Sequence, residues 1–211
     1  MTYLAENWDT VLQLTWEHIY LAGVALLVSV AVALPVGAVL ARFERLATVG
    51  LGLLSVIYTI PSMALFALLI PVTGLGFKTA AAALVAYSQF ILVRNTVAGL
   101  RGVDPAILEA AAGMGMSGWQ LFRDVRLPLA MPVILAGVRV ASVSIIGLAS
   151  LAAWINAGGL GVLLFQGLYQ DHAVKIWTGT VLIGLVAIGM SRLIERLERR
   201  ARAWLDGVER P

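Results

Sequence analysis

The sequence lacks cysteine altogether and has few histidines and few charged side chains. Without cysteine the chain can form no disulfide, thiolate metal site or cysteine nucleophile, and the two histidines, His18 and His172, are too few for a histidine-rich metal site. Only 13% of the 211 residues are charged, whereas 60% are hydrophobic and the mean hydropathy is +0.91. Soluble domains have about 25% charged residues. We therefore expect a membrane protein without a metal site, and not a soluble, disordered or nucleic-acid-binding domain.

Long stretches without acidic or basic side chains predict the membrane-spanning helices. About 20 mostly apolar residues cross the hydrocarbon core of a bilayer, and prolines and glycines mark the turns between such stretches. We predict an all-α integral membrane fold with a transmembrane domain at 18–191. Its five transmembrane helices are expected at about 18–41, 46–70, 77–93, 131–153 and 176–191.

Basic residues are distributed unevenly between the two sides of these spans. Twelve arginines follow the first, third and fifth spans, whereas only Lys78 and Lys175 lie on the opposite side. Because positive residues concentrate in cytoplasmic segments, we predict an N-terminus outside, with 1–17 as an external segment, and a cytoplasmic C-terminus. Residues 192–211 then form an amphipathic cytoplasmic tail along the inner membrane surface. Arg139, inside the fourth span, is predicted to snorkel towards the cytoplasm.

The predicted cytoplasmic loop at 94–130 contains signals for a short helix. Asp104 and Pro105 predict its start, because a carboxylate cap is followed by proline at the first helical position. Gly113 and Gly115 predict its end. The loop is therefore expected to hold helical structure of its own.

A second helix is predicted after the glycines. Ser117 and Gln120 have the spacing of a capping box, and this helix is expected to run to about Arg126 and to end at Leu127–Pro128. The small residues around Glu109 leave a smooth face that suits docking into a groove on a cytoplasmic partner. The alternative is an ordinary loop helix that lies on the bundle.

The loop carries a pattern that resembles a known signature. The pattern is similar to the EAA signature of ATP-binding-cassette importer permeases. It consists of Glu109–Ala111, Gly115 after a spacer of three residues, and Val125–Pro128 after a spacer of nine, with valine in place of the isoleucine of the signature. Other stretches resemble the osmoprotectant branch of that family. They are Thr59–Ser62, Arg94–Thr96, Gly102–Pro105, Pro132–Gly137 and Gly158–Gly161.

The resemblance implies the fold of a type I importer permease in the cell membrane and a transport subunit that is not itself an enzyme. Two permease subunits, identical or different, would form the translocation pathway and be surrounded by membrane lipids. Two ATPase subunits would bind ATP and Mg²⁺, and an external binding protein would deliver glycine betaine, choline, carnitine or proline betaine. This chain would hold no cofactor and bind no nucleic acid. Glu109, Ala110, Ala111 and Gly115 would contact the ATPase.

The region of Pro61 is a candidate for the translocation path. Proline removes a helical hydrogen bond and kinks a helix, so the Ile57 carbonyl is expected to be exposed beside the hydroxyls of Tyr58, Thr59 and Ser62. Irregular backbone at membrane depth is tolerated where it lines a cavity or is buried in protein. A simple packing kink is the alternative.

Asn156, Gly158 and Gly159 follow the fourth span and are predicted to form an outer gate, a contact for the binding protein or a simple external turn. A cationic substrate also favours aromatic walls. The aromatic candidates are Tyr58, Trp154, Phe165, Tyr169 and Trp177, of which Trp154 and Trp177 are expected to be interface anchors. An aromatic cage is expected chiefly in the binding protein.

Other functions stay open from the sequence. The same machinery could import another small zwitterion or an amino acid. A self-contained secondary transporter is expected to carry acidic residues in its spans, and none lies in 18–41, 46–77 or 140–170. A membrane adaptor without transport activity is the remaining class.

Overall fold

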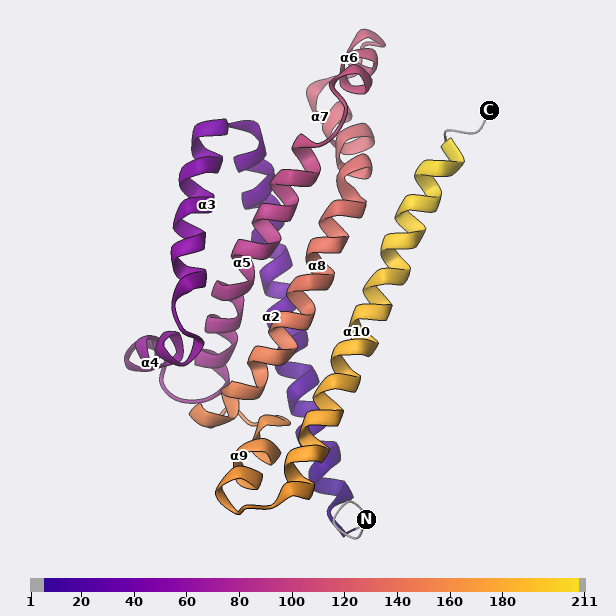
Figure 1. Ribbon diagram of the computed structural model, residues 1–211. Helices are drawn as coiled ribbons and strands as arrows, with labels where there is room; N and C mark the ends of the chain where they lie inside the picture. The colour runs from indigo at the N-terminus through magenta and orange to yellow at the C-terminus, as the bar shows by residue number, and fades with distance from the viewer. Residues whose placement is uncertain (1–5, 209–211) are drawn as a thin grey trace.

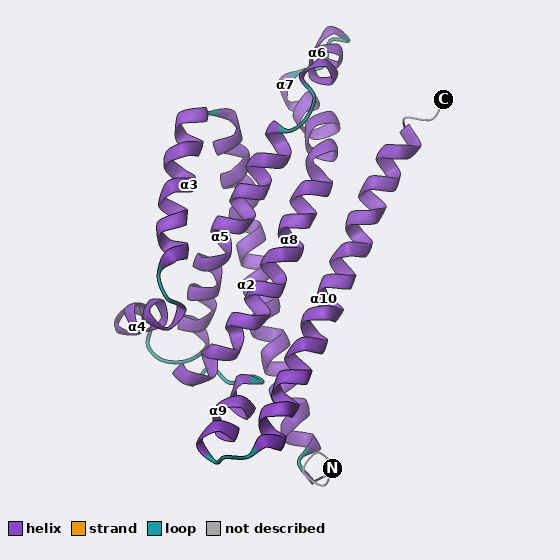
Figure 2. Cartoon of the chain, in the orientation of Figure 1, coloured by secondary structure: helices purple, strands orange, loops and turns teal. Residues whose placement is uncertain are grey.

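The computed structural model describes residues 6–208, with side chains through Arg202 (Figures 1 and 2). The predicted all-α fold is confirmed, because the described residues form helices and no strand. The elements are α2 (Trp8–Arg42), α3 (Glu44–Thr59), α4 (Ser62–Thr73), α5 (Phe77–Arg101), α6 (Pro105–Gly113), α7 (Gly118–Gln120), the π-helical η1 (Leu121–Arg126), α8 (Leu127–Ala149), the 3₁₀-helical η2 (Ser150–Ile155), α9 (Gly161–Tyr169) and α10 (Ala173–Val208).

Four helical segments of the described chain are long and apolar enough to cross a membrane, and the bent pair α3–α4 makes a fifth if it counts as one span. Large apolar side chains such as Leu27, Leu53 and Leu185 lie on the outside of the bundle, each more than half exposed. Such a surface suits lipid. The helices therefore meet the expectation of five spans only when the bent pair is counted once.

The first helix begins earlier than the predicted span. Val11 and Leu14 are buried like His18 and Leu21, at helical spacing, so the described part of the predicted external segment 1–17 belongs to the 35-residue α2. Residues 1–5 of that segment lie outside the described residues. An amphipathic face that continues without a breaker explains the longer helix.

The last helix also extends beyond its predicted span. α10 has 36 residues, or about 54 Å at 1.5 Å per residue, whereas the hydrocarbon core is about 30 Å thick. The described part of the predicted tail 192–211 is a direct continuation of this helix and not a separate helix turned along the membrane surface. Residues 209–211 lie outside the described part. Two ion pairs join residues four positions apart on this helix, Glu195–Arg199 and Glu198–Arg202, each with 2.6 Å between nitrogen and oxygen.

The second span is broken at Pro61. α3 ends at Thr59 and α4 begins at Ser62, with 97° between the two helices. A proline disfavours helical geometry in the residue before it, and Ile60 is indeed extended, with ψ at 129°. The expected kink in a continuous span at 46–70 is therefore a sharp turn between two helices.

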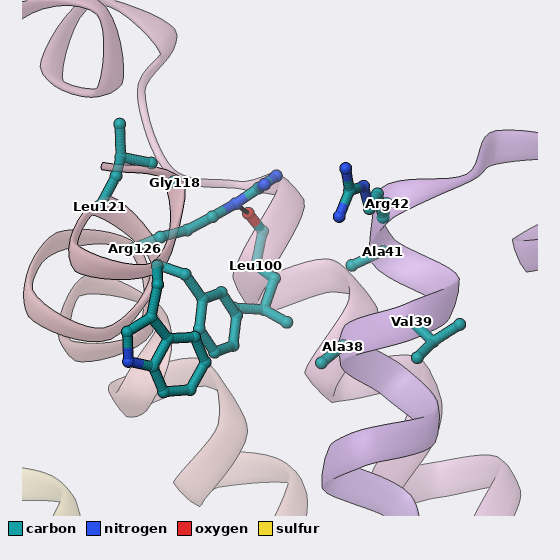
Figure 3. Close-up of a pocket in the computed structure, with 10 residues that line it drawn as sticks. Ala38, Val39, Ala41, Arg42, Leu100, Gly118, Leu121 and Arg126 are labelled. Atoms are coloured by element: carbon teal, nitrogen blue, oxygen red, sulfur yellow. Dashed lines mark hydrogen bonds between the residues drawn. The ribbon is translucent and has the colours of Figure 1, made fainter. Parts of the chain in front are cut away.

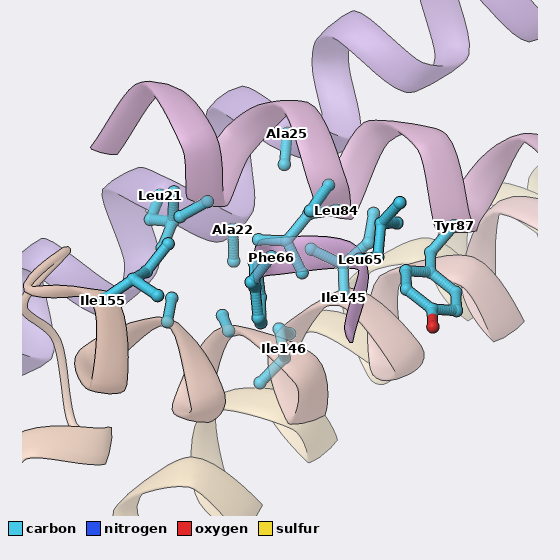
Figure 4. Close-up of a cluster of buried hydrophobic side chains, with 14 residues drawn as sticks. Leu21, Ala22, Ala25, Leu65, Phe66, Leu84, Tyr87, Ile145, Ile146 and Ile155 are labelled. Carbon is cyan, nitrogen blue, oxygen red and sulfur yellow. The ribbon is translucent and has the colours of Figure 1, made fainter. Parts of the chain in front are cut away.

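α5 lies at the centre of the bundle, packed against α2, α3, α4 and α8. The largest buried cluster joins α2, α4, α5, α8 and η2, with Phe66 among Leu84, Ile145 and Ile146 (Figure 4). Many of its other buried members are alanines, and small residues allow transmembrane helices to approach closely. The bundle therefore holds α2, α5 and α8 as one packed unit.

The two ends of the bundle differ. α6 and α7 lie at the same end as the C-terminal part of α10, whereas α9 lies at the end where α2 begins (Figure 1). The predicted loop and the predicted outer turn are thus at opposite ends.

Candidate coupling loop and translocation path

The helix caps predicted for the loop are confirmed. The Asp104 carboxylate accepts a hydrogen bond of 2.9 Å from the Ala106 N–H at the start of α6. Ser117 and Gln120 form a reciprocal capping box, with the Gln120 side-chain oxygen 2.9 Å from the Ser117 nitrogen and the Ser117 hydroxyl 3.3 Å from the Gln120 nitrogen. These bonds join residues that are close in the sequence, so the local sequence determines where both helices start.

The predicted end of the second helix at Leu127–Pro128 is wrong. α7, η1 and α8 form one continuous helical segment from Gly118 to Ile155. The π-helical turn η1 lies directly before Pro128, with the Leu127 N–H bonded to the Phe122 carbonyl. A proline is tolerated near a helix start, and the wide π turn accommodates its missing N–H. The loop therefore leads straight into the membrane-spanning α8.

The four residues predicted to contact the ATPase do not share one surface. Glu109, Ala110 and Gly115 are exposed, but Ala111 is only 3% exposed, on the helix α6 that packs against η1. A small side chain at Ala111 lets α6 lie close to η1, which is a role within the chain. Sequence reasoning missed Met114, whose side chain is 74% exposed at the end of α6.

Gly115 closes α6 through its backbone conformation. Its φ is +84°, and the Met116 N–H bonds to the Ala111 carbonyl in a Schellman arrangement. A Cβ at this position would meet nothing within 4 Å, so only the backbone requires glycine.

We expect Gly115→Ala to lower the free energy of unfolding by about 1–2 kcal/mol, because a left-handed conformation costs a residue with a Cβ about that much. Gly115→Asn is expected to recover part of the loss, since asparagine tolerates this region. Thermal unfolding of the purified protein in detergent measures both. Equal melting temperatures for the alanine and asparagine variants would contradict the assignment.

Two arginines attach the loop to the bundle. Arg101 donates to the carbonyls of Leu40 and Ala41 at the end of α2, each at 3.1 Å, and Arg126 donates to the Leu100 carbonyl at 2.8 Å. The last carbonyls of a helix lack helical partners. A hollow of about 610 Å³ separates the end of α2 from α7 and η1 beside these bonds (Figure 3). The loop is thus tied to α5, and α5 to α2.

The expected exposure of the Ile57 carbonyl is wrong. The Ile60 N–H bonds to it at 3.2 Å, and the Thr59 hydroxyl turns back to its own helix, 2.7 Å from the Val56 carbonyl. The carbonyl that the break exposes is that of Ile60, and the Tyr87 hydroxyl donates to it. Tyr87, on α5, is a residue that the sequence did not single out.

Tyr58 and Ser62 flank the break at Pro61 and line a hollow of about 480 Å³ together with Tyr87. The structure therefore brings together two of the four residues predicted for the path here. Thr59 and Pro61 do not line this hollow.

The predicted outer turn is anchored to α2. Asn156 has a left-handed conformation with φ at 62°, and the Gly159 N–H donates to the Glu17 carboxylate at 3.0 Å. A Cβ at Gly158 would lie 2.4 Å from the same carboxylate. His18 beside it is fully buried, with Nε2 3.1 Å from the Ile146 carbonyl.

Glu17 and His18 were missed because their partners are more than 120 residues away. The described residues contain no group of three or more potential metal ligands. The gate or binding-protein contact predicted at Asn156, Gly158 and Gly159 stays a prediction.

The apolar helical bundle has the character of a membrane protein, and comparisons with known proteins identify its family. Residues 33–203 match the family described as binding-protein-dependent transport system inner membrane component, and the chain belongs to this family. It is an inner-membrane permease family of ATP-binding-cassette importers, as the resemblance implied.

Characterised relatives align over nearly the whole chain. The carnitine transport permease protein OpuCB of Listeria monocytogenes is 38% identical over 95% of this chain and 92% of its own. The choline transport system permease protein OpuBB of Bacillus subtilis is 39% identical over 94% of this chain and 91% of its own. The osmoprotectant import permease protein OsmW of Salmonella typhimurium is 38% identical over 93% and 94%.

Solved structures share the fold. An inward-facing MetNI methionine ABC transporter aligns with a TM-score of 0.82 at 23% identity, over 90% of this chain and 95% of that chain. An amino acid ABC transporter crystallised with histidines aligns with a TM-score of 0.72 at 18% identity, over 94% and 97%. The expectation of a fold like that of ABC importer permeases is confirmed.

Proposed function

We propose that this chain is a permease subunit that imports osmoprotectants of the glycine betaine, choline, carnitine or proline betaine type. The observation that carries the proposal is the exposed α6 helix, which projects at one end and is tied through Arg126 and Arg101 to α5 and α2. A force applied to this loop would reach the packed helices of the bundle. The names of the relatives support the substrate class.

In this proposal the loop and the C-terminal part of α10 lie in the cytoplasm, and the first turn of α2 lies outside. Two ATPase subunits, which hold ATP and Mg²⁺, dock on the exposed residues Glu109, Ala110 and Gly115. Ala111 is buried on the face of α6 that packs against η1. A second permease, identical or different, completes the pathway, and an external binding protein delivers substrate near Asn156, Gly158 and Gly159. Binding of ATP would move the two loops together and switch access by rocking of the subunits.

ATP-dependent uptake of labelled glycine betaine and choline into vesicles tests this function. The vesicles hold this chain with its partner ATPase and binding protein. We expect uptake by the wild type and at least a tenfold loss in Glu109→Arg, because a reversed charge on the exposed face of α6 opposes docking, a change of about 1.4 kcal/mol or more. Glu44→Arg, which reverses an exposed acid at the start of α3 at the same end of the bundle, is the matched control and should keep uptake.

Unchanged uptake in Glu109→Arg would contradict the coupling role of α6. Failure to import either solute, with ATPase activity that still responds to a loaded binding protein, would point to another small zwitterion or an amino acid. Uptake without the ATPase would identify a secondary transporter. If the chain transports no solute under any of these conditions, it would be an adaptor.

A further inference from the structure

The hollow beside the α3–α4 break is lined mainly by aromatic rings and small side chains. Its residues come from α3, α4, α5 and α8, and it has a volume of about 480 Å³. They are Tyr58, Ser62, Tyr87, Ser144, Gly147 and Leu148. The lining contains no acidic residue, so a ligand that enters would meet ring faces and not a counter-charge.

Tyr58 is the centre of an aromatic cluster. Its ring lies 5.2 Å from that of Phe90 and 6.0 Å from that of Tyr87, the latter edge to face. The guanidinium of Arg94 lies 5.8 Å from the centre of the Phe90 ring, so a cation of the chain itself already covers that ring. Tyr58 is 42% exposed, so part of its side chain is accessible to a second cation.

Two of the four hydroxyl groups of the lining, those of Tyr87 and Ser144, have partners within the chain. The Tyr87 hydroxyl donates to the Ile60 carbonyl, and the Ser144 hydroxyl donates to the Val140 carbonyl at 3.1 Å. These bonds fix the Tyr87 ring and reduce the hydrogen-bonding groups that the hollow can offer. The hollow therefore offers the ring faces together with the hydroxyls of Tyr58 and Ser62.

The hollow lies deep between the ends of the bundle. Tyr58 is about 21 Å along α3 from Glu44, and Tyr87 is about 15 Å along α5 from Phe77, at about 1.5 Å per residue. A cation at this depth has lost much of its water, and cation–π attraction is strongest for desolvated cations. Quaternary ammonium groups cannot donate hydrogen bonds, so ring faces are their natural partners.

We propose that Tyr58 and Tyr87 form half of a transport site for the quaternary ammonium group of the substrate. This inference rests on the proposed function. The hollow is open at the surface of the chain, so the second permease closes it and keeps the substrate away from lipid. Tyr58 supplies the exposed ring, and Tyr87, held by the Ile60 carbonyl, supplies its fixed neighbour.

The test changes the negative charge on the face of the Tyr58 ring while the size of the ring stays similar. Tyr58→Phe and variants with one, two and three fluorines on that phenylalanine keep a ring of similar shape but weaken its negative face stepwise. Uptake of choline and glycine betaine is measured with saturating loaded binding protein. We expect this rate of uptake to fall with each fluorine, by about 3- to 30-fold over the series.

Tyr58→Leu is expected to lose uptake to a similar extent. Tyr20→Leu is the matched control, because it removes an exposed tyrosine whose ring lies 5.5 Å from Phe77, outside the hollow, and it should keep uptake. Assembly of each variant with the ATPase is measured by co-purification from the membrane.

Uptake that is insensitive to fluorine while the complex still imports choline would overturn the inference and leave the proposed function intact. The same holds if Tyr20→Leu loses as much uptake as Tyr58→Leu. A wild-type complex that imports no quaternary ammonium compound would overturn both.

Discussion

Gly161→Ala is expected to remove most of the folded protein. A Cβ at Gly161 would lie 1.8 Å from the carbonyl oxygen of Ser150 and 2.7 Å from its carbon. Both are backbone atoms of η2, so no side-chain rotation can relieve the overlap, and α9 would have to move away from η2. Overpacking costs about 1–3 kcal/mol even where side chains can adjust, and we expect more than about 3 kcal/mol here.

The yield of monodisperse protein extracted from membranes, and its melting temperature, measure this effect. Gly23→Ala is the control, because a Cβ at Gly23 in α2 would meet nothing within 4 Å. It should fold as well as the wild type. A normal yield and melting temperature for Gly161→Ala would show that η2 and α9 are not in this contact in the membrane.

Glu198→Leu is expected to lower the free energy of unfolding by about 2–3 kcal/mol. Glu198 is only 5% exposed and lies between Arg139 of α8, at 3.5 Å, and Arg202, at 2.6 Å. Removal of one partner of a buried ion pair costs about 3–5 kcal/mol. We expect a loss of stability at or below the lower end of this range, because the Arg139 side chain is 37% exposed and can reach water.

The double variant Arg139→Leu/Glu198→Leu is expected to recover much of this loss, since a buried ion pair can be replaced by apolar side chains at little net cost. Thermal unfolding of the wild type, both single variants and the double variant in detergent gives the coupling energy. A double variant that is as unstable as the sum of the single variants would show that the two side chains do not interact.

Local signals in the sequence predicted the local structure. The caps at Asp104 and at Ser117–Gln120 involve residues two or three positions apart, so spacing alone identified them. The long apolar stretches predicted an all-helical membrane fold for the same reason.

Contacts between distant residues were not predictable in this way. Ala111 lies within the signature predicted to face the ATPase, yet its burial depends on how α6 packs against η1. Arg139 was expected to snorkel, and its neighbour Glu198 lies on another helix. Tyr87 became relevant only because Pro61 turns the chain and exposes the Ile60 carbonyl to it.

The π turn before Pro128 has a mechanical consequence. Because it keeps Gly118–Ile155 continuous, one rod of about 57 Å connects the turn after α6 with the turn at Asn156. A tilt of about 10° around the middle of such a rod displaces each end by about 5 Å, in opposite directions. In the proposed permease dimer, a single pivot in α8 would therefore narrow one mouth of the pathway while it widens the other.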